Sequence, residues 1–187
     1  PLYSSAASDV YKRQLMDWVN RPPDEDSFDV VNRLNHRGFS VAILGDLLWV
    51  GTAGGINLSR DNGESWERFQ HADADTLSIT GNFVTALGAQ ITSTGRELLW
   101  AATWAAEGSG EYYGVSVTEN HGITWRRVLG SQAEPFRAHN FAFDDSIVYV
   151  ASDEGLYKSV DFGETWGRFP PIIDYESFEV MYDQRIY

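Results

Sequence analysis

The sequence predicts an all-β fold, and three observations support that prediction. Aromatic residues make up 14% of the 187 residues and glycine occurs 17 times, a mixture typical of short strands joined by tight turns. The apolar runs, such as residues 41–44 and 47–50, have the length of strands and are far too short to cross a membrane. The third observation is an eight-residue pattern that occurs three times along the chain.

Composition limits the class of protein. Hydrophobic residues account for 43% of the chain and charged residues for 22%, so we expect one globular domain or part of one. Asp and Glu outnumber Lys and Arg by 27 to 14, which gives a net charge of -13. A chain this acidic is repelled by phosphate backbones and anionic lipids, so neither nucleic acid nor a membrane is an expected partner.

The residue types also limit the chemistry. The chain has no Cys, which excludes disulfides, thiolate metal sites and a Cys nucleophile within it. It has neither a Gly-rich phosphate loop after a strand nor two His at the spacing of a metal site. We therefore expect no cofactor and no metal.

The repeated octet reads Ser or Thr, any residue, Asp or Asn, any residue, Gly, any residue, Ser or Thr, and Trp. It occupies residues 59–66, 118–125 and 159–166, and its Trp residues are 59 and then 41 positions apart. The shared positions are Ser59, Asp61, Gly63, Ser65 and Trp66; Thr118, Asn120, Gly122, Thr124 and Trp125; and Ser159, Asp161, Gly163, Thr165 and Trp166.

Each repeat contains the sequence of four short strands. In the first repeat we expect them near residues 39–44, 47–52, 56–60 and 66–70. The second strand recurs at 99–103 and 148–152 and is nearly all apolar, as in a sheet packed on both faces. A unit of this size with four strands matches a propeller blade. We therefore predict a β-propeller of four-stranded antiparallel blades, about three of them present in an incomplete ring.

The expected blades lie within residues 39–187, at about 39–70, 83–129 and 140–169, with a further one starting at 178. Residues 15–38 are expected to be the end of a preceding blade or a lead-in segment. Residues 1–14 show no strand or helix period and resemble translated sequencing adaptor, so we expect a non-native leader. An open arc leaves two blade faces bare, so we also expect poor solubility or self-association.

The octets resemble the Asp-box, or BNR, motif of the sialidase-like propeller superfamily, and the resemblance covers residues 39–187. It implies that each octet forms the turn between the third and fourth strands of its blade. In such a turn an Asp side chain accepts backbone N–H bonds and Gly adopts a positive φ. The three Trp residues are expected to be buried between blades. A Ca²⁺ or catalytic role for the Asp residues is the alternative, but one carboxylate per turn falls short of six to eight oxygen ligands.

The resemblance also implies that Asp-boxes lie on the face opposite the functional site. The middle repeat has an eight-residue insertion between Ala102 and Gly114, which places aromatic and acidic residues on the other face. The expected binding residues are Trp104, Glu107, Glu111, Tyr112, Tyr113, Arg137 and His139. Further polar residues in the connections between blades are His71, Asp73, Asp75, Glu134, Asp174, Tyr175 and Glu176. Aromatic rings beside carboxylates suit carbohydrate binding. The sequence favours the other interpretation, in which Trp104, Tyr112 and Tyr113 cover the edge of a neighbouring blade.

Three functions remain open. The first is a binding or scaffold propeller that engages a protein or glycan through these loops. The resemblance implies that it is extracellular, periplasmic or at the cell surface. The second is a glycoside hydrolase with the sialidase fold, whose catalytic residues lie largely outside this sequence. The arginine triad of sialidases has no counterpart here, and no catalytic set can be assigned, so the sequence favours a protein that is not an enzyme. The third is a purely structural repeat array.

Overall fold

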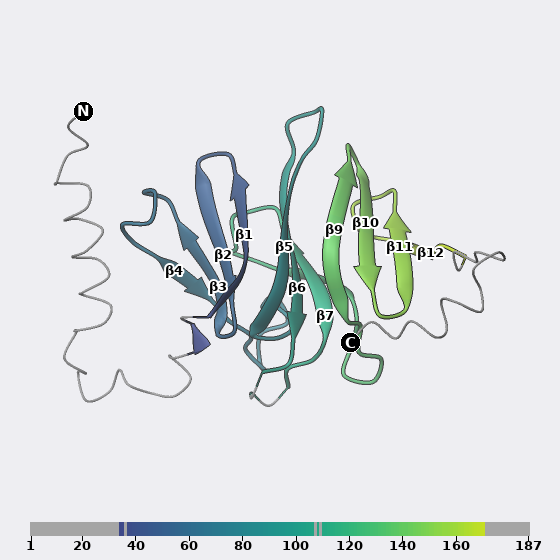
Figure 1. Ribbon diagram of the computed structural model, residues 1–187, viewed down its shortest axis with the longest axis horizontal. Helices are drawn as coiled ribbons and strands as arrows, with labels where there is room; N and C mark the ends of the chain where they lie inside the picture. The colour runs from purple at the N-terminus through teal and green to yellow at the C-terminus, as the bar shows by residue number, and fades with distance from the viewer. Residues whose placement is uncertain (1–33, 36, 107, 109, 171–187) are drawn as a thin grey trace, which may run out of the picture.

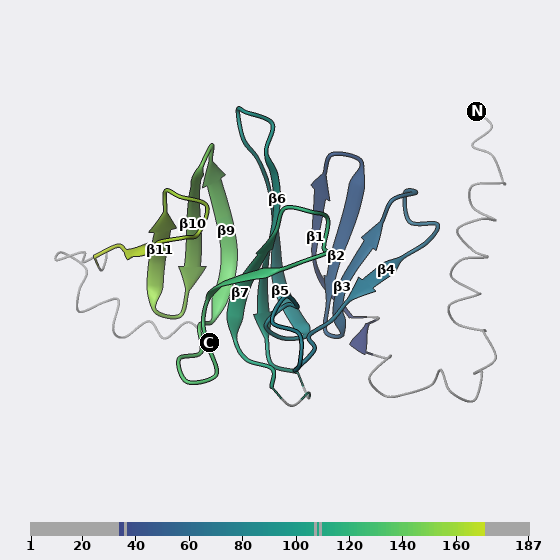
Figure 2. The ribbon, with the colours of Figure 1, turned by 180° about the vertical axis from the view of Figure 1, so that it is seen from behind.

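The computed structural model describes residues 34, 35, 37–106, 108 and 110–170. Within them, twelve strands form three separate four-stranded antiparallel sheets. The three sheets lie side by side and do not close into a ring (Figures 1 and 2). The prediction of an all-β fold built from four-stranded blades is therefore confirmed. The expected leader, residues 15–33 of the lead-in segment and the further blade at 178 lie outside the described residues.

In each sheet the strands follow one another in chain order, so every connection is a hairpin. The first sheet contains β1 (Gly38–Leu44), β2 (Leu47–Thr52), β3 (Gly55–Ser59) and β4 (Glu67–Phe69). The second contains β5 (Phe83–Ile91), β6 (Glu97–Trp104), β7 (Gly114–Thr118) and β8 (Arg126–Leu129). The third contains β9 (Ala138–Asp144), β10 (Ile147–Ser152), β11 (Gly155–Ser159) and β12 (Gly167–Arg168).

The first strands β1, β5 and β9 pack against one another from sheet to sheet. The second strands bring the largest side chains into the core, because their apolar runs are covered on both faces. Trp49 of β2 and Trp100 of β6 are completely buried. Two apolar clusters result, one around Trp49 between the first and second sheets and one around Trp100 between the second and third.

The octets form the turns between the third and fourth strands of all three sheets, at the upper edge in Figure 1. In the third turn, Thr165 donates from its N–H to Asp161 Oδ1 at 2.9 Å and from its hydroxyl to Oδ2 at 2.6 Å. Ser159 Oγ also donates to Asp161, at 2.7 Å. The hydroxyl and N–H of Thr165, with the Ser159 bond, lower the pKa of Asp161 to about 2, because all three stabilise the charged form.

The other two turns repeat this arrangement. In the first, the hydroxyl and N–H of Ser65 lower the pKa of Asp61 to about 2. In the middle turn Asn120 replaces the carboxylate: its Oδ1 accepts the Thr124 N–H at 2.9 Å, and its Nδ2 donates to the Thr124 hydroxyl at 2.8 Å. The amide can do this because the Thr hydroxyl reverses its role from donor to acceptor.

The octet Trp residues differ in burial. Trp125 is 2% exposed and packs edge-on against Trp49, and Trp166 packs in the same way against Trp100. Trp66, expected to be buried between blades, is instead 37% exposed. The reason is positional: each octet Trp packs on the preceding sheet, and the described residues contain no sheet before the first. No helix in the described ranges has the length and apolar character needed to span a membrane.

Candidate functional site

The edge opposite the octet turns carries the connections from β2 to β3, β6 to β7 and β10 to β11 (the lower edge in Figure 1). The segments joining one sheet to the next reach the same edge. Among the three connections within a sheet at this edge, the inserted segment after β6 is the longest. Such connections are positioned by rigid strands, but their side chains do not have to pack in the core. Binding residues are therefore often found on them.

The three first strands share a β-bulge at their start. Pairing with the second strand passes over Phe39 in β1, Thr85 in β5 and His139 in β9. These are equivalent positions, because the residues before them pair with Thr52, Thr103 and Ser152, which are the last or next-to-last residues of the second strands. A bulge leaves its extra residue outside the ladder and redirects its side chain. The fold therefore presents one such residue per blade at this edge.

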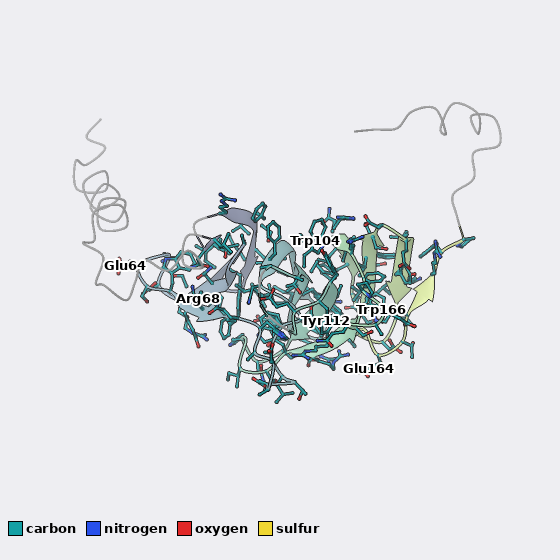
Figure 3. The ribbon with its side chains drawn as sticks, turned by 90° about the horizontal axis from the view of Figure 1, so that it is seen from below. Glu64, Arg68, Trp104, Tyr112, Glu164 and Trp166 are labelled. Carbon is teal, nitrogen blue, oxygen red and sulfur yellow. The ribbon has the colours of Figure 1, made fainter. Side chains whose placement is uncertain are left out.

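A group of side chains gathers around Trp104, at the end of β6. Its ring stacks on Phe83 with centroids 6.1 Å apart and planes 19° from parallel. The Tyr113 ring also contacts Trp104, with centroids 5.8 Å apart. The His139 ring lies edge-on to Trp104, with centroids 5.9 Å apart. We call Phe83, Trp104, Tyr113, Arg137, His139 and Asp153 the rim cluster; Figure 3 shows Trp104 from this side.

Charged groups complete the rim cluster on the third sheet. Arg137 lies over the Tyr113 ring, with Cζ 4.5 Å from its centroid. Asp153 Oδ1 shares a 2.6 Å hydrogen bond with His139 Nε2, and its Oδ2 lies 3.8 Å from Arg137 Nη1. The three polar side chains are 44 to 52% exposed. The cluster thus joins packed rings to accessible acid, base and guanidinium groups.

The backbone fixes these positions. The Asp153 N–H donates to Arg137 O at 3.1 Å, which holds the β10 to β11 turn against the start of β9. The Phe136 N–H donates to Tyr113 O at 2.9 Å, which ties the segment that leads into β9 to the inserted segment. Trp104 lies at the centre of the cluster. It is half-buried, and its indole N–H is buried without an acceptor among the residues that the structure describes.

Glu111 holds the inserted segment in shape. Its Oε2 accepts the N–H of Ala106 at 2.6 Å and of Asn82 at 3.1 Å. Its Oε1 accepts the Asn82 side chain at 2.6 Å and the Gly108 N–H at 3.2 Å. Four donors around one carboxylate leave it engaged with its own loop, so Glu111 positions the segment. Glu107 lies outside the described residues.

The other predicted residues lie apart from the rim cluster. Tyr112 stands beside the Arg127 guanidinium, 5.8 Å from its Cζ, and Figure 3 places it over the middle sheet. His71 is 4% exposed, with Nδ1 2.7 Å from Ile79 O and Nε2 3.1 Å from Asp73 Oδ1. Asp75 accepts the Leu77 N–H at 2.8 Å, and Glu134 is exposed in a tight turn closed on Ser131. Asp174, Tyr175 and Glu176 lie outside the described residues.

A cavity of about 260 Å³ lies on the same edge, between the first sheet and the inserted segment. Its polar walls are the side chains of Gln70, Asn82 and Glu111. Gln70 donates to Gly54 O at 3.0 Å, and Asn82 donates to Glu111. All three side chains already form hydrogen bonds within the protein, so the cavity is less able to take a new polar ligand than the rim cluster.

Sequence reasoning missed two members of the rim cluster, Phe83 and Asp153. Both could have been found by aligning the ends of the paired strands. Asp153 directly follows Ser152 in the third sheet, just as Trp104 directly follows the equivalent residue Thr103 in the second sheet, and Phe83 is the residue that pairs with Trp104. No group of three or more metal-ligating side chains occurs in the part of the chain that the structure describes. The arrangement is chemically suited to holding a ligand by ring contacts, one carboxylate and two nitrogen donors.

Comparisons with known proteins identify the fold that this chain resembles. No family model matches the chain, and no curated protein matches it. Among solved structures, an ancestral GH74 enzyme is 22% identical with a TM-score of 0.56, and the alignment covers 78% of this chain and 20% of that one. The extracellular domain of a hybrid two-component system from B. thetaiotaomicron is 15% identical, also with a TM-score of 0.56, over 80% of this chain and 20% of that one.

The chain thus spans about a fifth of the length of each of these two proteins. At such identity the likeness concerns the fold alone. It agrees with the three four-stranded sheets, whose first strands face one another and whose octet turns all lie on one edge. The chain therefore has the fold of the β-propeller proteins, as an arc of three blades that does not close into a ring.

Proposed function

We propose that this chain is part of a binding propeller and that its rim cluster takes a carbohydrate. The observation that carries the proposal is the meeting of Trp104 and Tyr113 with His139, Arg137 and Asp153 at one edge of the arc. Sugar rings present C–H faces that pack on aromatic rings and hydroxyls that bond to charged side chains. A site that combines apolar contact with a few oriented polar groups has the general form of a ligand site.

The exposed polar groups supply the selectivity in this proposal. Asp153 accepts from sugar hydroxyls, Arg137 donates to ring or hydroxyl oxygens, and His139 does either according to its tautomer. The bulge at His139 carries its side chain out of the β9 ladder, where a ligand can reach it. Phe39, the equivalent bulge residue of the first sheet, is 49% exposed and lies 4.6 Å from Phe83, so it extends the aromatic surface.

We further infer that the three octets are Asp-box repeats. The turns support this inference, because Asp61, Asn120 and Asp161 bind the same neighbours in all three sheets. We also place the protein outside the cytoplasm, at the cell surface or secreted. A glycan-binding role supports that placement, and so does the fold shared with an extracellular domain.

The test is a glycan array probed with the 187-residue chain, followed by titration calorimetry with the oligosaccharide that gives the strongest signal. We expect Arg137→Ala and His139→Ala each to weaken binding by about 10-fold, which corresponds to about 1.4 kcal/mol. Arg96→Ala is the matched control, since Arg96 is 40% exposed and paired with Glu119 outside the rim cluster. It should leave the affinity unchanged.

Two results would overturn the proposal. One is an array without signal while a pull-down recovers a protein that loses binding on Arg137→Ala, which would make the rim cluster a protein site. The other is binding that Arg137→Ala and His139→Ala leave unchanged. Release of reducing ends from the bound oligosaccharide, abolished by Asp153→Asn, would instead favour a hydrolase.

A further inference from the structure

Neighbouring sheets meet through two different surfaces, and each end of the arc exposes one of these two surfaces. Where two sheets meet, one presents residues of its first strand and its octet Trp; we call this its leading face. The other presents an aromatic residue of its second strand; we call this its receiving face. Trp125 of a leading face meets Trp49 of a receiving face, and Trp166 meets Trp100.

The leading face of the first sheet has no partner among the described residues. Its Val41 and Ile43 are 65% and 68% exposed. Their register partners, Val50 and Leu48, make them equivalent to Phe141 and Phe143 in β9, which pack on Trp100. The first sheet thus leaves bare the same strand positions that are covered in the third.

The receiving face of the third sheet also has no partner in the part of the chain that the structure describes. In the first sheet Trp49 and Phe69 lie 5.8 Å apart and together hold Trp125. In the third sheet Tyr149 and Phe169 repeat this pair at 6.1 Å, and Phe169 is 39% exposed. A hollow of about 380 Å³ borders Phe169 at that end of the arc.

The charges of the two bare faces are complementary. Inside the arc, Arg126 of the second sheet reaches the third octet turn, where its Nη1 lies 3.3 Å from Glu164 Oε1. Glu64 occupies the position of Glu164 in the first octet turn. On the receiving face of the third sheet, Lys158 pairs in register with Tyr149, and its Nζ lies 5.5 Å from the centroid of that ring. A leading face with an acidic turn therefore finds a lysine on the receiving face.

We propose that the leading face of the first sheet of one copy docks on the receiving face of the third sheet of a second copy, head to tail. The second copy is the occupant that carries both the aromatic pair Tyr149 and Phe169 for Trp66 and the Lys158 ammonium for Glu64. Because the two surfaces differ, the contact is heterologous, and it either closes into a ring or extends into a chain. The contact is independent of the rim cluster, which lies on a different edge.

The experiment uses light scattering on the 187-residue chain across a concentration series. We expect the mass to exceed that of a monomer and to rise with concentration. Ile43→Glu, on the leading face, and Phe169→Glu, on the receiving face, should each give a monomer. Ile123→Glu is the control, because Ile123 is 79% exposed on an octet turn inside the arc; it should associate like the unaltered chain.

Mixing the two variants distinguishes a head-to-tail contact from nonspecific association. The Ile43→Glu copy keeps its receiving face and the Phe169→Glu copy keeps its leading face, so an equimolar mixture should form a one-to-one dimer. Circular dichroism of each variant checks that both remain folded; if Phe169→Glu unfolds, Lys158→Glu takes its place. A monomer at every concentration, association unaffected by Ile43→Glu, or a mixture that stays monomeric would each refute the proposal.

Discussion

Trp125 lies edge-on to Trp49 across the boundary between the first and second sheets, with ring centroids 6.4 Å apart and planes at 87°. Trp166 stands in the same relation to Trp100, at 6.2 Å and 90°. Each octet therefore does two things: its polar residues close a turn, and its Trp fills the space against the preceding sheet. Edge-to-face aromatic contacts add to the area that such rings bury.

Trp125 and Trp66 offer a matched pair for measuring that contribution. Trp125→Ala should lower the free energy of unfolding by about 3–5 kcal/mol, because it removes a buried ring and leaves a cavity. Trp66→Ala removes the same side chain where it is 37% exposed, so the loss should be about 1 kcal/mol or less. Urea unfolding at low protein concentration measures both. Equal losses would mean that Trp66 is as well packed as Trp125.

Two glycines separate backbone strain from steric conflict. Gly122 and Gly63 have φ of 88° and 94°, so alanine at either position should cost about 1–2 kcal/mol in this left-handed region. A Cβ on Gly122 would also stand 2.5 Å from the Phe69 ring, whereas on Gly63 the nearest atom is 3.6 Å away.

Gly122→Ala should therefore lose a further ~1–3 kcal/mol from overpacking. Thermal or urea unfolding of the two variants side by side measures the difference. If both lose the same amount, Phe69 moves aside without cost, and the boundary between the first two sheets is softer than its packing indicates.

The octet carboxylates make stability depend on acid pH. Hydrogen bonds from Ser65 and Thr165 lower the pKa of Asp61 and Asp161 to about 2, from about 3.8 in the unfolded chain. A lowered folded pKa stabilises the fold above the unfolded value, and that stabilisation is lost as pH falls from about 4 to about 2.

The double variant Asp61→Asn with Asp161→Asn should therefore show a shallower loss of unfolding free energy over this range. Asn120 shows that the turn accepts the amide, so the variant should fold at neutral pH. Urea unfolding at steps between pH 2 and pH 6 checks the slope. Identical slopes in both proteins would place the acid sensitivity elsewhere.

Glu111 is expected to organise the inserted segment and to contact no ligand. Glu111→Gln replaces one acceptor oxygen by an NH₂ group that faces N–H donors, so at least two of its four bonds should be lost. Amide hydrogen exchange should then become faster at Ala106 and Asn82 if the NH₂ group takes the position of Oε2, or at Gly108 if it takes the position of Oε1. Glu119→Gln, which removes a surface partner of Arg96, is the control and should leave those amides unchanged. Unaltered exchange in Glu111→Gln would show that the segment holds its shape without the carboxylate.

Much of the fold could be predicted because its signals are local. In the first sheet the expected strands match those observed within one or two residues, since apolar runs and turn residues set strand ends within a few positions. The candidate site was less accessible to prediction. Trp104, Tyr113, Arg137 and His139 do come together, but Glu111 turned inward to bind its own loop, and Asp153 was missed. Those outcomes depend on which strand ends meet across two sheets.

By itself, the sequence determined the repeat, the four-stranded units and the turn chemistry of the octets. It could do so because each depends on residues that are neighbours in the chain, where spacing alone dictates hydrogen bonding. Only the tertiary structure decided that Trp125 is buried and Trp66 exposed, and that Asp153 meets His139. Octets of the same pattern differ in this way because burial depends on the adjacent sheet. A β-bulge at His139 sets where that side chain points.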